Sequence, residues 1–112
     1  MLILVAACAT PDVTGTYEGA QPAASAGGER QVAVMLDADG SATVTSAFSG
    51  RPSRFLVKGK WRRTKNEVIV TLEQAPRYEE IVFRREGDKL VATWWERPTW
   101  GAEGPGTLTR VK

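Results

Sequence analysis

From residue 14 onward, the chain consists of short runs rich in β-branched and aromatic residues, separated by turn-forming residues at nearly regular intervals. This spacing is typical of all-β domains, and no stretch has the 3.6-residue period of an amphipathic helix. Consecutive strands joined by short turns predict an antiparallel up-and-down meander, which closes most simply into a small barrel, with a sandwich as the alternative. We expect about eight short strands, at residues 14–20, 29–36, 41–48, 54–62, 67–74, 78–86, 89–96 and 106–111.

The first hairpin to be tested for consistency surrounds residues 63–66. Pairing Arg62 with Glu67 across a four-residue turn places Trp61 opposite Val68. Because side chains alternate along a strand, the apolar residues then share one face and the charged residues share the other. The pattern predicts a half-buried antiparallel pair.

Two further hairpins have turn residues of recognised types. Gly-Asp at 87–88 suits a two-residue turn, and the pairing then places Phe83 opposite Ala92 and Ile81 opposite Trp94. The predicted turn keeps these four side chains on one face.

The remaining hairpin has its turn at residues 37–40, where the sequence predicts a three-residue loop with a bulge at Gly40. With Gly40 in the left-handed conformation, Val34 faces Ala42 and Val32 faces Val44. The bulge is needed because a symmetric turn would place valines opposite threonines.

Residues 1–7 are entirely apolar and end at Cys8, the only cysteine of the chain. Val-Ala-Ala before Cys8 fits the bacterial lipobox, in which the cysteine is lipidated and becomes the new N-terminus. The segment lacks a positive n-region and is short for a secretory signal, and an apolar stub with a buried cysteine is the alternative. A transmembrane helix would need about 20 apolar residues. We expect three parts: a truncated signal segment at 1–7, a tether at 8–13 and a single barrel domain at 14–112.

The composition restricts the chemistry. The 112 residues contain no histidine and one cysteine, which argues against most metal sites, Ser-His-Asp or Cys-His catalysis, and an internal disulfide. The net charge of +2 does not suggest nucleic-acid binding. We find no phosphate loop, nucleophile elbow or paired carboxylates, and therefore expect no enzyme, no catalytic residues, no metal and no cofactor.

Several short motifs are distributed along the chain: Gly15-Thr-Tyr-Glu-Gly-Ala-Gln-Pro-Ala-Ala, Asp39-Gly40, Phe55 with Gly59-Lys-Trp61, Leu90, and Leu108-Thr-Arg-Val111. Together they resemble the N-terminal domain of NlpE-like lipoproteins. The resemblance implies an outer-membrane lipoprotein with a lipocalin-like barrel, on the periplasmic side or cell surface, linked to copper resistance, adhesion and envelope stress. Its partners would be the membrane, through the anchor, and an unidentified envelope protein or lipid. The family's first long loop often carries Cys-x-x-Cys where this chain has Ala-Ala-Ser-Ala at 23–26, and the second domain of some members is absent.

Gly15-x-Tyr17 is also similar to the first strand of lipocalin-type barrels, where an arginine from the last strand covers the aromatic ring. Arg110 is the matching arginine. The resemblance implies a cation–π contact that closes one end of the barrel as a structural site. The alternative is that Tyr17 belongs to the core and Arg110 is solvated.

A basic run in the middle of the chain places four cations on the outer face of one strand. These could attract lipid phosphates or an acidic polymer. They could instead form a solvated face balanced by the glutamates at 67, 73, 79 and 80. The basic face consists of Arg54, Lys58, Lys60 and Arg62.

Residues 94–100 contain three tryptophans beside an arginine, a composition found at binding hot spots. Alternation with Trp94 inside leaves Trp95 outside, so Trp95, Arg97 and Trp100 are the candidate partner surface. Capping of the barrel end and contact with lipid are the alternatives. Residues 20–29 and 97–105 are predicted to be flexible loops. A hydrophobic-ligand carrier and a lysozyme-inhibitor-like binding protein are the competing functions.

Overall fold

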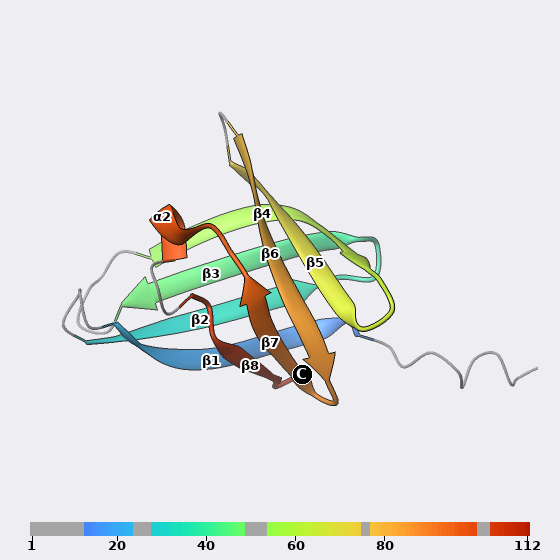
Figure 1. The fold of residues 1–112 in the computed structure, drawn as a ribbon, viewed down its shortest axis with the longest axis horizontal. Helices are drawn as coiled ribbons and strands as arrows, with labels where there is room; N and C mark the ends of the chain where they lie inside the picture. Colours follow the sequence, from blue (N-terminus) through green and yellow to red (C-terminus); the bar gives the residue numbers. More distant parts are fainter. Residues whose placement is uncertain (1–12, 24–27, 49–53, 75–76, 101–103) are drawn as a thin grey trace, which may run out of the picture.

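The computed structural model describes residues 13–23, 28–48, 54–74, 77–100 and 104–112. Eight antiparallel strands pair in sequence order, and the last strand pairs with the first, so that the sheet is a closed barrel (Figure 1). The strands are β1 (Gly15–Ala23), β2 (Gly28–Leu36), β3 (Ser41–Phe48), β4 (Arg54–Arg63), β5 (Glu67–Gln74), β6 (Arg77–Glu86), β7 (Lys89–Trp94) and β8 (Thr107–Arg110). The predicted all-β barrel of eight strands is confirmed.

The predicted loops differ from the structure in two places. Strands β1 and β2 extend into the segment 20–29, and only residues 24–27 of that segment lie outside the described part. In the segment 97–105, a single helical turn, α2 (Arg97–Trp100), follows β7 (Figure 1). A four-residue helix has no measurable sequence period, which is why the pattern did not predict it. No helix in the part of the chain that the structure describes could cross a membrane.

Pairing between β1 and β8 closes the barrel over a short distance. Tyr17 is opposite Arg110, and Glu18 is opposite Thr109. Beyond the ladder, the Thr16 amide donates to the Lys112 carbonyl oxygen at 3.1 Å. This short seam leaves no open strand edge between the first and last strands at this end of the barrel.

The interior is filled by side chains from every strand, because each strand places alternate residues inward. Phe83 and Tyr17 are the largest side chains that are completely buried. The partly buried Trp61, Ala92 and Trp95 pack against this core. The buried apolar residues are Val13, Tyr17, Val32, Val34, Leu36, Ala42, Val44, Val57, Val68, Val70, Leu72, Ile81, Phe83, Leu90, Trp100 and Leu108.

The loop between β2 and β3 has the predicted form. Asp37 N donates to Ser41 O at 2.9 Å across three intervening residues, and Gly40 has a positive φ of 92°. The predicted partners were wrong by two residues, however, because Val34 pairs with Val44. The loop closes with Asp37 opposite Ser41, so the glycine bulge moves the partners of β2 one residue toward the end of β3. The sequence interpretation moved them one residue toward the start of β3. The faces are unchanged, since a shift of two preserves alternation.

The same kind of error occurs in the β4–β5 hairpin. Thr64 N donates to Glu67 O at 2.9 Å, so the turn has two residues between this pair instead of the expected four. Trp61 consequently lies opposite Val70 and not Val68. The shift of two residues again leaves each side chain on its predicted face.

The β6–β7 hairpin contains a β-bulge that the sequence interpretation did not include. Glu86 pairs with Lys89, and Phe83 pairs with Ala92, both as predicted. The register then shifts, and Trp94 lies opposite Val82 instead of Ile81. The extra residue is Thr93, whose hydroxyl donates to the Val82 carbonyl oxygen at 3.2 Å. Because one inserted residue reverses the alternation, Trp94 points outward instead of into the barrel.

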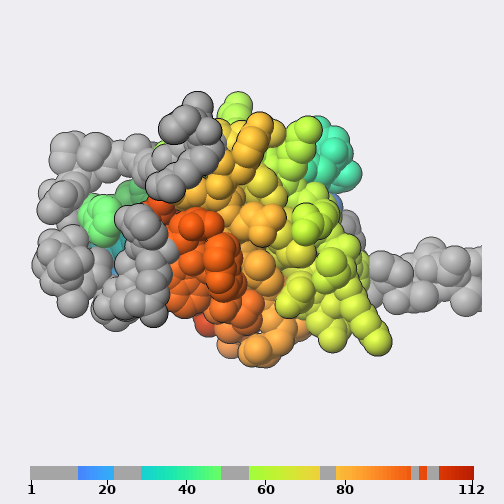
Figure 2. Space-filling model, turned by 45° about the horizontal axis from the view of Figure 1, so that its top comes forward, coloured from blue at the N-terminus to red at the C-terminus, as the bar shows by residue number. Residues whose placement is uncertain are grey.

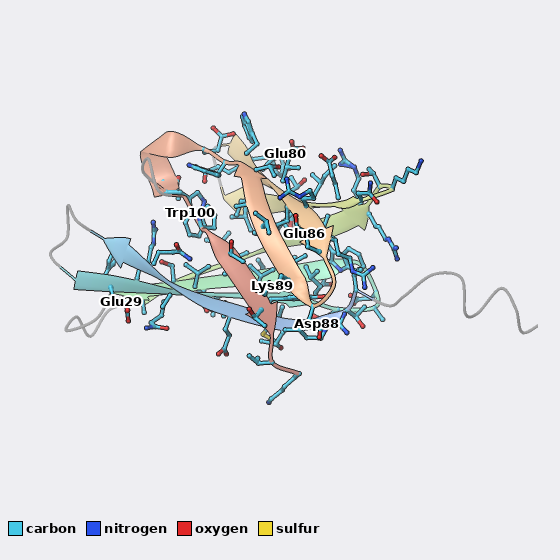
Figure 3. The ribbon with its side chains drawn as sticks, turned by 60° about the horizontal axis from the view of Figure 1, so that its bottom comes forward. Glu29, Glu80, Glu86, Asp88, Lys89 and Trp100 are labelled. Atoms are coloured by element: carbon cyan, nitrogen blue, oxygen red, sulfur yellow. The ribbon has the colours of Figure 1, made fainter. Side chains whose placement is uncertain are left out.

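The two ends of the barrel differ in character. The turn end contains the loops at 37–40, 64–66 and 87–88, and β1 begins there, beside Leu36. The α2 end contains the helical turn at the opposite mouth. In Figure 3, Trp100 of α2 lies at one end of the barrel, whereas Glu86, Asp88 and Lys89 lie at the β6–β7 turn.

Candidate functional surfaces

The predicted pair at the seam is in direct contact. The guanidinium carbon of Arg110 lies 5.4 Å from the centre of the Tyr17 ring. The Tyr17 hydroxyl accepts hydrogen bonds from Arg110 Nη2 at 2.9 Å and Nε at 3.3 Å, and donates to Val13 O at 2.8 Å. Strands β1 and β8 bring the residues together by placing them opposite each other. That this contact stabilises closure stays a prediction.

The α2 end contains a polar cluster that the sequence interpretation missed. Arg30 on β2 donates to Ser46 Oγ at 2.8 Å and to the carbonyl oxygens of Thr99 at 3.3 Å and Trp100 at 3.2 Å. From the opposite wall, Glu79 accepts hydrogen bonds from the Thr99 hydroxyl at 2.7 and 2.8 Å. The cluster therefore holds α2 against the mouth of the barrel from two sides.

Arg30 and Glu79 are polar residues at positions where alternation along the strand points the side chain inward. Arg30 follows the alternation of the buried Val32 and Val34, and Glu79 that of the buried Ile81 and Phe83. A polar residue at an inward position is a usable sequence signal, because burial of such a group requires partners. Burial lowers the pKa of the Arg30 guanidinium.

Aromatic side chains hold Arg30 in place. Its guanidinium carbon lies 4.4 Å from the centre of the Trp100 ring and 5.0 Å from that of Phe48. Such stacking is favourable for a planar guanidinium. This end is consequently packed as a plug, with ring stacking and hydrogen bonds acting on the same arginine.

The candidate partner surface of the sequence interpretation requires correction. Trp100 is 2% exposed and caps the barrel end, as the alternative for this segment has it. Trp95 is half-buried against the core, and its ring is so close to Gly104 that a Cβ there would lie 2.4 Å from it. The side chain of Arg97 lies outside the described part.

Among the side chains that the structure describes, the exposed aromatic ones are instead Trp94, 51% exposed, and Tyr78, 70% exposed. Trp94 belongs to an outer-face row in which Ile69 of β5 and Val82 of β6 are its successive neighbours. In Figure 2, side chains of β4–β5 in yellow-green and of β6–β7 in orange lie on one continuous face. The bulge at Thr93 turns Trp94 outward and so adds it to an aromatic surface (Tyr78, Val82, Trp94), next to which Ile69 is buried.

The basic face lies where alternation predicted it. Lys58, Lys60 and Arg62 are exposed, and the residues between them are buried or half-buried. Arg54 belongs to the same strand, but its side chain lies outside the described part, as does Cys8. The lipidation of Cys8 stays a prediction.

The part of the chain that the structure describes contains no grouping of three His, Cys, Asp or Glu side chains that could hold a metal ion. A hollow on the outer face of β1–β3 is lined by small and polar residues, including Glu18, Ala33 and Thr45. It lacks the enclosed apolar wall that small-molecule sites usually have.

Comparisons with known proteins agree with the architecture. No protein-family model matches the chain, and a search of curated proteins finds no match. Among solved structures, the crystal structure of the Cpx pathway activator NlpE from Escherichia coli superposes with a TM-score of 0.61 and 23% sequence identity. The match covers 87% of this chain and 45% of that one, so this chain spans less than half the length of the NlpE structure. The chain therefore has an NlpE-like fold.

Proposed function

We propose that the chain is a non-enzymatic lipoprotein of the bacterial envelope, anchored in the outer membrane through Cys8, and that it signals envelope stress by binding another envelope component. The match to a Cpx pathway activator over 87% of the chain carries this proposal. The lipobox before Cys8 supports the anchor. Copper binding is not part of the proposal, because the chain has no histidine and a single cysteine.

The packing of the barrel favours binding at the outer surface over transport of a ligand inside it. Side chains from all eight strands meet in the interior, and the largest of them are completely buried. A carrier would need an apolar cavity of about 300 Å³ or more. The aromatic surface is the better candidate for a protein contact, since exposed Trp and Tyr side chains are frequent at binding hot spots.

The anchor is tested by detergent phase partitioning of the protein made in bacterial cells behind a complete lipoprotein signal peptide. We expect the native chain to enter the detergent phase and the Cys8→Ala variant to remain in the aqueous phase. If both remain aqueous, the anchor and the membrane location are wrong.

Signalling is tested by overproduction in cells that carry a Cpx-dependent reporter. We expect the native chain to raise reporter output and the Trp94→Ala variant to lower the response. Val111→Ala is the matched control, because Val111 is also 51% exposed but lies after β8. An equal response to both variants would remove the aromatic surface from the proposal, and no response to the native chain would contradict the signalling role.

A further inference from the structure

Three cations form a regular row on the outer wall of β4. Lys58, Lys60 and Arg62 are exposed and alternate along the strand, so that successive charges are about 6.6 Å apart. Lys65 in the following turn is also exposed and extends the row toward the turn end. Leu56, 55% exposed, lies at the other end of the same outward series.

The residues paired with this basic row on the neighbouring strands are uncharged. Across the ladders, Lys60 lies between Ser41 and Thr71, and Arg62 lies opposite Ile69. The nearest acids on the β3 side are Asp37 and Asp39, which are exposed in the β2–β3 loop beside Trp61. None of the three cations forms an ion pair within 4.0 Å in the part of the chain that the structure describes, so their charged groups face solvent.

The glutamates that the sequence interpretation assigned to balance the row differ in their placement. Glu79 is buried at the α2 end, where it accepts from Thr99. Glu67 lies opposite Arg84 and two residues along β5 from Ile69, the partner of Arg62, without an ion pair to the row. Glu80 and Glu73 remain on the outer face.

Of these two glutamates, Glu80 lies away from the row. It pairs with Thr71 and is therefore two strands, about 10 Å, from Lys60, a separation at which surface charges are largely screened at physiological ionic strength. Glu73 follows Leu72, the partner of Gly59, and so lies one position beyond the last pair of the β4–β5 ladder, on the side of Lys58. It forms no ion pair with Lys58 within 4.0 Å.

The row ends where the chain enters the barrel. Trp61 N donates to Gly40 O at 2.9 Å, and Leu36 before that loop pairs with Gly15 at the start of β1. Figure 1 shows the start of β1 and the β4–β5 turn at the same end of the molecule. Four residues lie between Cys8 and Val13, so the five Cα–Cα steps reach at most about 18 Å. A lipid on Cys8 would therefore keep this end close to the bilayer.

We propose that the basic row (Lys58, Lys60, Arg62 and Lys65) binds the anionic headgroups of the bilayer that carries the anchor. The inference rests on the proposed function, since the anchor is what brings the turn end to the membrane. The row supplies cations at the spacing of alternate strand residues, and Leu56 adds an exposed apolar side chain beside them. Binding would lay the β4 wall against the headgroups.

The experiment uses the full chain with Cys8→Ala, so that lipidation contributes nothing. The sedimentation of this variant is measured with vesicles of phosphatidylcholine alone and with vesicles that also contain phosphatidylglycerol, an anionic lipid, at about 30%. The readout is the ratio of the two partition coefficients, in which any contribution of the apolar residues 1–7 cancels. Each basic residue at an anionic surface raises partitioning about fivefold.

We expect Lys60→Gln/Arg62→Gln to lower this ratio about 25-fold. The matched control is Lys89→Gln/Lys112→Gln, which removes the same charge from two exposed residues away from β4. The control should change the ratio by less than about twofold. Circular dichroism and thermal unfolding of every variant establish that the barrel is folded.

Three results would overturn the inference: no preference for the anionic vesicles, equal loss in both double variants, or binding to a soluble polyanion without binding to vesicles. The last result would assign the row to an acidic polymer or protein. None of these depends on lipidation, so detergent partitioning of the native chain can fail or succeed separately. The two proposals are therefore distinguished by separate measurements.

Discussion

Replacing Tyr17 with phenylalanine tests whether the contact at the seam stabilises the closed barrel. The substitution keeps the ring under Arg110 but removes the hydroxyl, which donates to the buried carbonyl of Val13 and accepts from the guanidinium. A neutral hydrogen bond contributes about 1 kcal/mol, and one to a charged group about 1.5–3 kcal/mol. Because Arg110 is half-buried, water replaces part of the second contribution. We expect the free energy of unfolding to fall by about 2 kcal/mol and Tm by roughly 10 °C.

The assay is urea unfolding followed by tryptophan fluorescence, with the slope against denaturant required to stay constant. Tyr78→Phe is the matched control, because Tyr78 is 70% exposed, and it should change stability by less than about 0.5 kcal/mol. Arg110→Met completes a double-mutant cycle, in which we expect a coupling energy of about 1–2 kcal/mol. In the Tyr17→Phe background, Arg110→Met then reports what Arg110 contributes without the hydroxyl, of which the ring contact is about 0.5–1 kcal/mol.

A loss below about 0.5 kcal/mol for Tyr17→Phe would refute the reasoning. So would a coupling energy near zero, because the two residues would then act independently despite their contact. In either case Tyr17 would contribute only as an apolar core residue, and the seam would depend on the β1–β8 ladder.

The other predictions concern placement and turn chemistry. Trp100→Ala should lower the free energy of unfolding by about 3–5 kcal/mol because its ring is buried, whereas Trp94→Ala should lower it by less than about 1 kcal/mol. Thermal unfolding of the two variants checks this, and equal losses would contradict the outward position of Trp94 after the bulge. Gly59→Ala should destabilise by about 2 kcal/mol or more, because its Cβ would lie 2.0 Å from a strand carbonyl oxygen, whereas Gly40→Ala meets no atom within 4 Å and should cost about 1 kcal/mol for its positive φ. The Asp39 carboxylate accepts from a backbone amide at 2.9 Å, which lowers its pKa below the ordinary 3.8; its contribution to stability should therefore be complete above that pH and be lost as the pH falls through the folded value. An NMR titration with a midpoint at or above 3.8 would contradict this.

The strand pattern, most turns and the basic face could be predicted from the sequence, because they depend on local chemistry. Alternation assigns Lys58 and Lys60 to the outer face whatever strand lies beside them. Gly40 predicts a bulged loop because positive φ carries little cost for glycine. These features require no knowledge of distant contacts.

Features that depend on the choice between nearly equivalent pairings could not be predicted in this way. A two-residue shift leaves every side chain on its face, so alternation alone cannot distinguish Val44 from Ala42 as the partner of Val34. The bulge at Thr93 has no glycine to mark it. For this reason Trp94 and Trp95 were assigned to the wrong faces.

By itself, the sequence determined that this chain forms an eight-stranded antiparallel barrel with a basic outer strand, since period-two patterning and turn residues act over a few positions. Only the tertiary structure decided which aromatic residues are exposed, how Arg30 and Glu79 hold α2 from opposite walls, and which glutamates lie away from the basic row. The physical reason is that these contacts join residues far apart in sequence. Their geometry is set by barrel closure and by one inserted residue in β7, neither of which leaves a local pattern.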